Sequence, residues 1–112
     1  MRNKVILLAS DQLGAGDPGL GQNILETFFV LLKQRQDPPA AVFCMNRGVL
    51  ALTKRSFASV HLAELAQAGV PVLACRTCVE FYDVESQLTA GEVSSMAVFV
   101  DLAAKHEVLT IS

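Results

Sequence analysis

Short runs of apolar residues alternate along the chain with longer segments in which apolar residues recur every three or four positions. Four runs are typical of strands buried on both faces: residues 5–9, 40–45, 70–74 and 108–111. The longer segments predict helices over residues 19–34, 59–68 and 95–105, with shorter helical pieces near residues 49–52 and after residue 78. This alternation predicts one three-layer α/β/α domain spanning residues 1–112, with a mainly parallel sheet of about four to five strands.

Capping residues mark several helix boundaries. Asp17 is a favourable N-cap with Pro18 at the first helical position, and Gly69 is a natural stop for the second helix. Ser94 or Ser95 caps the last helix, and Glu92 lies near the start of that helix, where an acidic residue favours the helix dipole. We therefore expect residues 86–91 to form a loop that leads directly into the last helix.

Two predicted helices carry broad apolar surfaces. The first has a wide stripe, formed by Ile24, Leu25, Phe28, Phe29, Leu31 and Leu32. A stripe of this width predicts two contacts, one with the sheet and one with a neighbouring chain. The last helix carries apolar residues that we place on one side, namely Met96, Phe99, Val100 and Ala103.

The composition narrows the class of protein. The chain has 112 residues, of which 52% are hydrophobic and 18% are charged, and these proportions exclude a disordered chain. A monomer of this length has little interior in which to bury so much apolar surface, so we expect a homo-oligomer. The net charge is −2 and the only basic cluster is the pair Lys54 and Arg55, so we expect no nucleic-acid partner.

The termini and the cysteine count suggest where the protein works. The apolar run after Lys4 is too short for a signal peptide, and it is broken by Ser10 and Asp11. No apolar run approaches the roughly 20 residues of a membrane span. The three cysteines lack the spacing of a secreted disulfide framework. We therefore expect a cytoplasmic protein with reduced thiols and no membrane partner.

Candidate chemistry gathers where the predicted strands end, because ligands in open parallel sheets bind beyond the carboxyl ends of the strands. Cys75 and Cys78 directly follow a buried strand and are the strongest candidates for a catalytic role. If Cys78 begins a helix, the helix dipole and Arg76 should lower the pKa of a thiol there. Cys44 lies inside an apolar strand and is expected to be structural.

The loop over residues 10–17 is a second candidate. Gly14 and Gly16 could let its backbone approach an anion at the following helix N-terminus, although Asp11 and Asp17 argue against a nucleotide phosphate. The two histidines, His61 and His106, are expected to be exposed and without a catalytic role, and Tyr82 is expected to serve in packing.

Several motifs together resemble the DsrE-like family of sulfur-relay proteins. They are Ser10-Asp11 with Leu13-Gly14-x-Gly16-Asp17, Leu20-Gly21, Asn46-x-Gly48, Cys75-x-Thr77-Cys78 with Phe81-Tyr82, and Ala90-Gly91-Glu92-Val93-Ser94-x-Met96. They occur in the same order over nearly the whole chain. The chain is most similar to the DsrE-like domain at the C-terminal end of YedF-type proteins, which are named for sulfurtransferase-like selenium metabolism.

The resemblance implies a three-layer parallel fold, an oligomer, and a cysteine after the third strand that accepts sulfur as a persulfide. By motif that cysteine is Cys75, and Cys78 belongs to a subset with two thiols. YedF-type proteins also carry a TusA-like domain, which this chain lacks, so a TusA-like or similar protein would be the sulfur donor or acceptor. The matching motifs supply candidate binding residues: Ser10, Asp11, Gly14, Gly16, Asp17, Asn46, Gly48, Arg76 and Thr77.

The leading hypothesis is a small sulfur-relay protein, a sulfurtransferase-like carrier if it is catalytic, and no cofactor is expected. A dithiol oxidoreductase that uses Cys75 and Cys78 is one alternative. A zinc site would need four ligands, and only one close cysteine pair is present to join Cys44 and a histidine. A flavin site is disfavoured by the acidic loop and by the absence of Trp. A non-catalytic oligomeric binding module is the remaining alternative.

Overall fold

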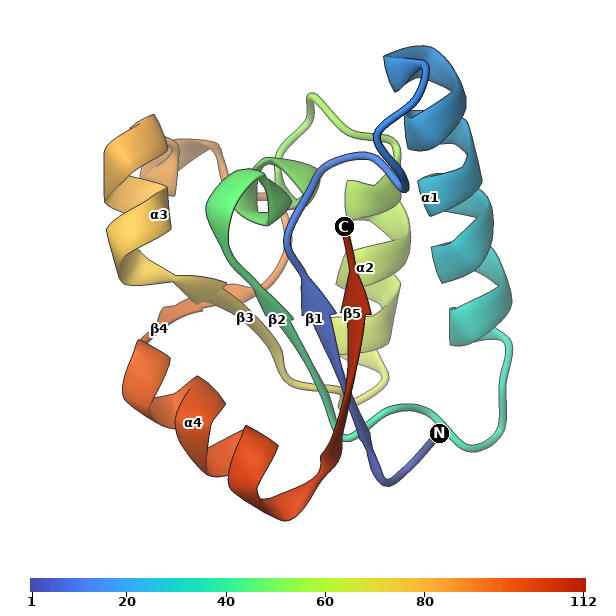
Figure 1. The fold of residues 1–112 in the computed structure, drawn as a ribbon, viewed down its shortest axis with the longest axis vertical. Helices are drawn as coiled ribbons and strands as arrows, with labels where there is room; N and C mark the ends of the chain where they lie inside the picture. The colour runs from blue at the N-terminus through green and yellow to red at the C-terminus, as the bar shows by residue number, and fades with distance from the viewer.

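Five parallel strands form one sheet in the computed structural model, which describes residues 1–112 (Figure 1). In chain order they are β1 (Lys4–Leu8), β2 (Ala41–Cys44), β3 (Val72–Cys75), β4 (Glu92–Ser94) and β5 (Glu107–Ile111). Their order across the sheet is β4-β3-β2-β1-β5, and every neighbouring pair is parallel. The predicted α/β fold class with a parallel sheet is confirmed.

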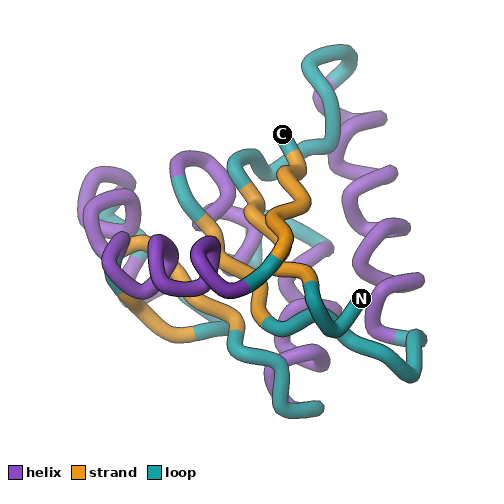
Figure 2. Tube along the Cα trace, turned by 60° about the horizontal axis from the view of Figure 1, so that its bottom comes forward, coloured by secondary structure: helices purple, strands orange, loops and turns teal.

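Helices cover both faces of this sheet. The helices are α1 (Pro18–Lys33), α2 (Ala58–Gln67), α3 (Arg76–Tyr82) and α4 (Met96–Lys105), and two 3₁₀ segments are η1 (Asn46–Leu52) and η2 (Glu85–Gln87). The helices α1 and α2 pack side by side on one face, while α4 crosses the other face (Figure 2). The segments η1 and α3 lie at the carboxyl ends of the strands (Figure 1).

None of the four helices combines the length and the apolar character needed to cross a bilayer.

The larger core lies between the sheet and the pair α1 and α2. From α1, the buried residues are Gly21, Leu25, Phe29 and Leu32. Of the rest of the predicted stripe, Phe28 is half-buried against this core, while Ile24 and Leu31 remain exposed. The helical period of 3.6 residues places positions 25, 29 and 32 on one side, so a stripe this wide cannot be covered by a single sheet face.

A polar network joins α1 to α2 and corrects the expectation for one histidine. The His61 side chain is only 14% exposed. Its Nδ1 accepts a hydrogen bond from Lys33 Nζ at 2.9 Å, and its Nε2 lies 3.0 Å from Glu26 Oε2. Lys33 also forms an ion pair with Glu64. Because an ammonium group can only donate, this arrangement assigns the Nε2–H tautomer to His61. The sequence prediction that His61 is exposed was wrong.

A thinner layer lies beneath α4 on the opposite face. Phe43, Leu73 and Cys75 form a small buried cluster there, and Phe99 of α4 packs on Phe43 with ring centroids 5.1 Å apart. The face of α4 that packs on the sheet consists of Phe99 and Leu102.

The predicted apolar side of α4 was therefore partly wrong. Met96 is 44% exposed and Val100 is 60% exposed, and no residue of α4 is fully buried. The helix has apolar residues around most of its circumference, so periodicity alone does not identify which of them meet the sheet.

The segment before α4 differs from the sequence prediction. Residues 92–94 form the edge strand β4, with Val93 beside Ala74, where the sequence predicted no strand. Gly91 turns the chain with a φ of +76°, and Ser95 then caps α4 by accepting a hydrogen bond from the Val98 amide. A three-residue edge strand carries no apolar run, so its strand character depends on pairing with β3 rather than on local sequence.

Close backbone packing fixes η1 against the end of β1. A Cβ atom added to Gly48 would overlap the Leu8 carbonyl oxygen, a backbone atom that cannot move aside cheaply. The same carbonyl accepts a hydrogen bond from the Met45 amide at 2.9 Å. Only glycine therefore allows η1 to follow β2 at this distance from β1.

We predict that Gly48→Ala lowers the free energy of unfolding by about 1–3 kcal/mol, because the new methyl group must push η1 away from β1. Chemical denaturation followed by circular dichroism measures this change. Gly16→Ala is the matched control, since an added Cβ there meets nothing within 4 Å. Equal effects of the two substitutions would show that the contact with Leu8 is not a constraint.

Candidate functional site

A cavity at the carboxyl ends of β2 and β3 contains one of the two candidate thiols. Its volume is about 310 Å³. The residues that line it come from the segment after β2 and from α3, and they are Met45, Asn46, Thr77, Cys78, Phe81 and Tyr82. This position beyond the strand ends is where parallel sheets place ligands and reactive groups.

The local sequence explains how α3 presents its side chains to the cavity. β3 ends at Cys75, which is the N-cap residue of α3, so the helix begins at Arg76 rather than at Cys78. Cys78 and Tyr82 are four residues apart and therefore share one side of the helix. Asp83 then ends α3 in a left-handed conformation with a φ of +54°.

Asn46 connects the two halves of the cavity. Its backbone amide donates a hydrogen bond to Cys78 Sγ at 3.0 Å, and its side-chain Oδ1 accepts one from the Tyr82 hydroxyl at 3.2 Å. Asn46 adopts a left-handed φ of +51°, which asparagine tolerates better than most residues. The turn after β2 therefore brings an N–H group directly to the sulfur of Cys78.

The three cysteines occupy three different environments. Cys75 is 4% exposed and packs with Phe43 and Leu73 beneath α4. Cys44 is fully buried in the core on the other face of the sheet, against α1 and α2. Cys78 is partly exposed and lines the cavity. All three are free thiols.

Burial opposes ionisation of the cavity thiol. It raises the pKa of Cys78, and the neighbouring Cys75 thiol raises it further, while the hydrogen bond from the Asn46 amide partly counteracts both effects. Burial also raises the pKa of Cys44, well above its usual range. For Cys78, the expected lowering of the thiol pKa was therefore wrong, because removal from water outweighs the single N–H donor.

Arg76 does not direct its charge at the thiols. Its guanidinium group extends toward two carboxylates, with Nη1 3.9 Å from Glu80 Oε2 and 4.0 Å from Glu85 Oε1. The side chain is more than half exposed. Water and these carboxylates therefore screen the Arg76 charge, which the sequence had predicted to act on the cysteine pair.

A second arginine fixes the wall of the site. Arg47, which follows Asn46 in η1, donates from Nε and Nη2 to the two carboxylate oxygens of Asp11 at 3.2 and 3.1 Å. This bidentate pair raises the pKa of Arg47. It joins the loop after β1 to the turn after β2, so Asp11 contributes to the site by holding η1.

The other candidate residues of the first loop lie outside the cavity and have local contacts. Ser10 Oγ accepts a hydrogen bond from the Gln12 amide, and Asp17 caps α1 by accepting one from the Leu20 amide at 2.9 Å. Gly14 adopts a φ of +88°, and Gly16 has open space around its Cα. The structure thus brings Asn46 and Thr77 to Cys78, and it does not bring these loop residues there.

Sequence reasoning missed three residues of the cavity: Met45, Phe81 and Tyr82. The four-residue spacing of Cys78 and Tyr82 was a usable signal, because it places both on one side of a helix. Met45 gave no such signal, because it is the last residue of the apolar run that predicts β2. Tyr82 packs edge-to-face against Phe81, as expected, and its hydroxyl also donates a hydrogen bond to Asn46.

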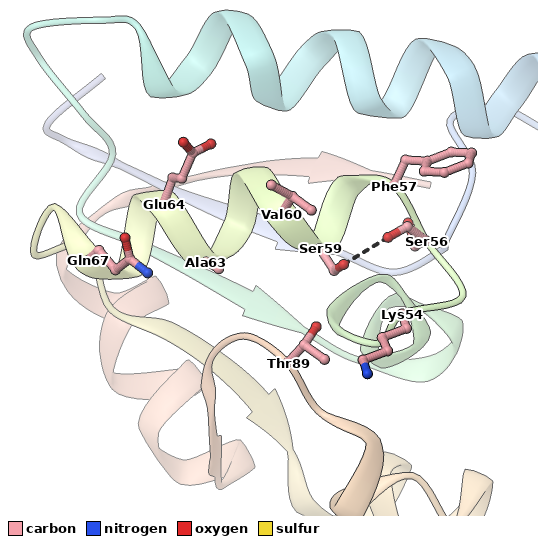
Figure 3. A pocket seen from close by; sticks show the side chains of 9 residues that line it. All are labelled: Lys54, Ser56, Phe57, Ser59, Val60, Ala63, Glu64, Gln67 and Thr89. Atoms are coloured by element: carbon pink, nitrogen blue, oxygen red, sulfur yellow. Dashed lines mark hydrogen bonds between the residues drawn. The ribbon is translucent and has the colours of Figure 1, made fainter.

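A larger hollow of about 440 Å³ lies along the outer side of α2 (Figure 3). Its hydroxyl groups are engaged locally, since Ser59 Oγ donates to the Ser56 carbonyl at 2.8 Å. It contains no cysteine or histidine. No three side chains among the His, Cys, Asp and Glu residues of the chain come together as a metal site. In particular, Cys44 and Cys75 lie on opposite faces of the sheet.

Comparisons with known proteins identify the fold. No protein-family model and no curated protein sequence matches this chain. Among solved structures, the ychN protein from E. coli superposes with a TM-score of 0.72 at 21% identity, covering 99% of this chain and 100% of that one. It is a protein of the DsrE/DsrF-like fold, so the chain has that fold.

Two proteins of unknown function give similar results. One from Bacteroides thetaiotaomicron has a TM-score of 0.67 at 19% identity, covering 97% of this chain and 95% of that one. The other, from Methanobacterium thermoautotrophicum, has a TM-score of 0.64 at 16% identity, with 96% of both chains covered.

We predict that an alkylating reagent modifies Cys78 about tenfold or more faster than Cys75, because only the Cys78 thiol lines a cavity. The raised pKa further predicts that the Cys78 rate still increases above the pH at which a free cysteine is half ionised. Trypsin separates the three cysteines into residues 36–47, 56–76 and 77–105, so mass spectrometry can follow each one.

Cys75→Ala provides the control for this pH dependence. This substitution removes the Cys75 thiol, which raises the pKa of Cys78. The pH profile of the Cys78 alkylation rate should therefore move to lower pH. Cys44→Ala should leave the profile unchanged, since Cys44 lies on the other side of the sheet. Faster modification of Cys75 than of Cys78 would contradict the assignment of the accessible thiol.

Proposed function

We propose that this protein is a small sulfur-relay protein that carries sulfane sulfur as a persulfide on Cys78. The observation that carries this proposal is the free Cys78 thiol, which lines a cavity at the sheet edge and accepts a hydrogen bond from a backbone amide. The motif resemblance assigned the accepting role to Cys75, but that thiol is only 4% exposed. A donor protein would reach Cys78 without any rearrangement of α4.

The proposed reaction is a transfer of one sulfur atom without net oxidation. The Cys78 thiolate attacks the outer sulfur of a donor persulfide, the donor S–S bond breaks, and the donor leaves as a thiolate. Cys78 then holds the sulfur as Cys78–S–SH. In the second step an acceptor thiolate attacks that outer sulfur, and Cys78 leaves as a thiolate that takes up a proton.

The raised pKa of Cys78 suits a carrier that retains its sulfur. A thiol with a higher pKa is less ionised at neutral pH but is a stronger nucleophile once ionised, and it is a slower leaving group. At neutral pH the smaller ionised fraction slows loading and the poorer leaving group slows release, so a loaded Cys78 retains its sulfur until an acceptor thiolate reaches it. During delivery, negative charge develops on Cys78 Sγ, and the Asn46 amide is placed to stabilise that charge.

Cys75 is placed to act on the loaded carrier. Its thiol is close enough to influence the ionisation of Cys78. In the absence of an acceptor, Cys75 could attack the inner sulfur of the Cys78 persulfide, which forms a Cys75–Cys78 disulfide and releases hydrogen sulfide. This step would unload the carrier.

The sulfur donor or acceptor is proposed to be another protein, of the TusA-like or a similar kind, as the resemblance to YedF-type proteins implies. The apolar rim of the cavity supports a protein partner, because Phe81 is 81% exposed beside Cys78. The same resemblance suggests selenium as an alternative cargo, which a selenium-bearing donor would test.

We predict that incubation with a small persulfide, such as glutathione persulfide, adds one sulfur atom to the tryptic peptide 77–105. Capping with an alkylating reagent before digestion preserves the modification for mass spectrometry. Cys78→Ser should abolish the gain, while Cys75→Ser should retain it and prolong its lifetime, because the unloading thiol is absent.

Cys44→Ser is the matched control and should behave like the unaltered protein. Sulfur on peptide 56–76, with loss of the gain in Cys75→Ser, would transfer the accepting role to Cys75. No sulfur on any of the three peptides would reject the sulfur-relay proposal.

A dithiol redox function is the second candidate, and it is favoured by the nearness of the two free thiols, since the Cys75 thiol raises the pKa of Cys78. It predicts a reversible disulfide between them with a reduction potential in the range of thiol oxidoreductases, about −120 to −270 mV. Titration in glutathione buffers, read as loss of alkylation on both peptides, measures this potential. Disulfide formation without any stable persulfide would favour the redox function over the carrier.

A further inference from the structure

The strand β5 leaves one edge of the sheet open. It pairs with β1 on one side only, and it is the last strand in the order β4-β3-β2-β1-β5 (Figure 1). Figure 1 looks onto this edge, with β5 in front of β1 and no other element over it. Val108 is 39% exposed, and Thr110 is also exposed. An open edge presents unpaired backbone groups to another strand.

The hydrogen bonds to β1 identify which groups are unpaired. Glu107 donates its amide to the Asn3 carbonyl, and the Ile111 carbonyl accepts from the Ala9 amide, both at 2.9 Å. In a parallel pair, alternate residues direct their N–H and C=O groups to the same neighbour. The groups of residues 107, 109 and 111 therefore face β1, and those of Val108 and Thr110 face outward.

This edge lacks the features that normally prevent pairing with another strand. Within β5 there is no proline, glycine or lysine, and its only charged residue, Glu107, is neutralised by Lys4 at 2.8 Å. The opposite edge differs, since β4 has only three residues and begins with an exposed glutamate. Of the two edges, β5 is the one suited to accept a strand.

We propose that β5 pairs antiparallel with β5 of a second copy of this chain, about a two-fold axis that passes beside Leu109. In this register Val108 lies opposite Thr110 of the other copy, and Thr110 lies opposite its Val108. Each of these two hydrogen-bonded pairs exchanges two N–H···O bonds, which gives four bonds and uses every outward group of the two strands. The result is one continuous sheet across both copies.

The self-complementarity of the strand favours a second copy over a different partner. The pairs across the axis join β-branched Val108 to Thr110, residue types that strands favour, and place Leu109 against its own counterpart, so no like charges face each other. Glu107 lies opposite Ile111, so the like charges of the two copies stay apart. A two-fold interface requires such a self-complementary surface.

Cysteine cross-linking tests the register directly. Two residues facing each other across the axis as a non-hydrogen-bonded pair have Cα atoms about 4.5 Å apart, which a disulfide can bridge. Leu109→Cys, made in a Cys78→Ser background to remove the accessible native thiol, should form a covalent dimer under mild oxidation. Glu107→Cys in the same background is the matched control, because its two copies would lie about 13 Å apart.

Solution size provides an independent measurement. Sedimentation velocity of the unaltered protein should show a dimer or a multiple of it, and Thr110→Pro should shift it toward monomer by removing two of the four bonds. Thr110→Val keeps the backbone amide and should remain associated. The proposal is overturned if the unaltered protein is monomeric at every concentration, or if residue 107 cross-links as readily as residue 109. Association that persists in Thr110→Pro without cross-linking at residue 109 would assign the interface to another surface.

Discussion

The site depends on the close contact between η1 and the end of β1. Gly48 permits a backbone approach that any side chain would prevent, and the Leu8 carbonyl binds the Met45 amide in the same contact. This contact fixes where the chain leaves β2, and the next residue, Asn46, can then direct its amide at Cys78. The Arg47–Asp11 pair holds the same turn from the other side. A backbone contact beside Cys44, in the strand pair β1–β2, thus helps to set the surroundings of the Cys78 sulfur.

The geometry of the parallel sheet places the three thiols in three different environments. Successive residues of a strand point to opposite faces, and the ends of the strands open toward ligands. Cys44 consequently belongs to the core beneath α1 and α2, Cys75 to the layer beneath α4, and Cys78 to the cavity beyond the strands. Of the three, only Cys78 combines access with a hydrogen-bond donor. Its raised pKa is the consequence of partial burial, and it makes this thiol better suited to holding sulfur than to releasing it.

The sequence predicted much of the fold, because apolar strand runs and helix caps are local patterns. The apolar runs predicted β1, β2, β3 and β5, the cap Asp17 marked the start of α1, and of the two alternatives Ser94 and Ser95 the structure has Ser95 as the cap of α4. β4 was missed, since three polar or half-buried residues form a strand only when β3 is beside them. The buried side of α4 was also partly misassigned, because eight of its ten residues are apolar and only Asp101 and Lys105 mark a polar side.

For the site, the family resemblance supplied Asn46 and Thr77, and the sequence by itself determined the pair of cysteines and their place after a buried strand. It determined these because residue spacing and strand order are properties of the chain alone. Tertiary structure decided which thiol is accessible, which amide meets it, and in which direction its pKa moves. Those outcomes depend on desolvation and on contacts between residues more than thirty positions apart, such as Asn46 and Cys78, and no local pattern encodes them.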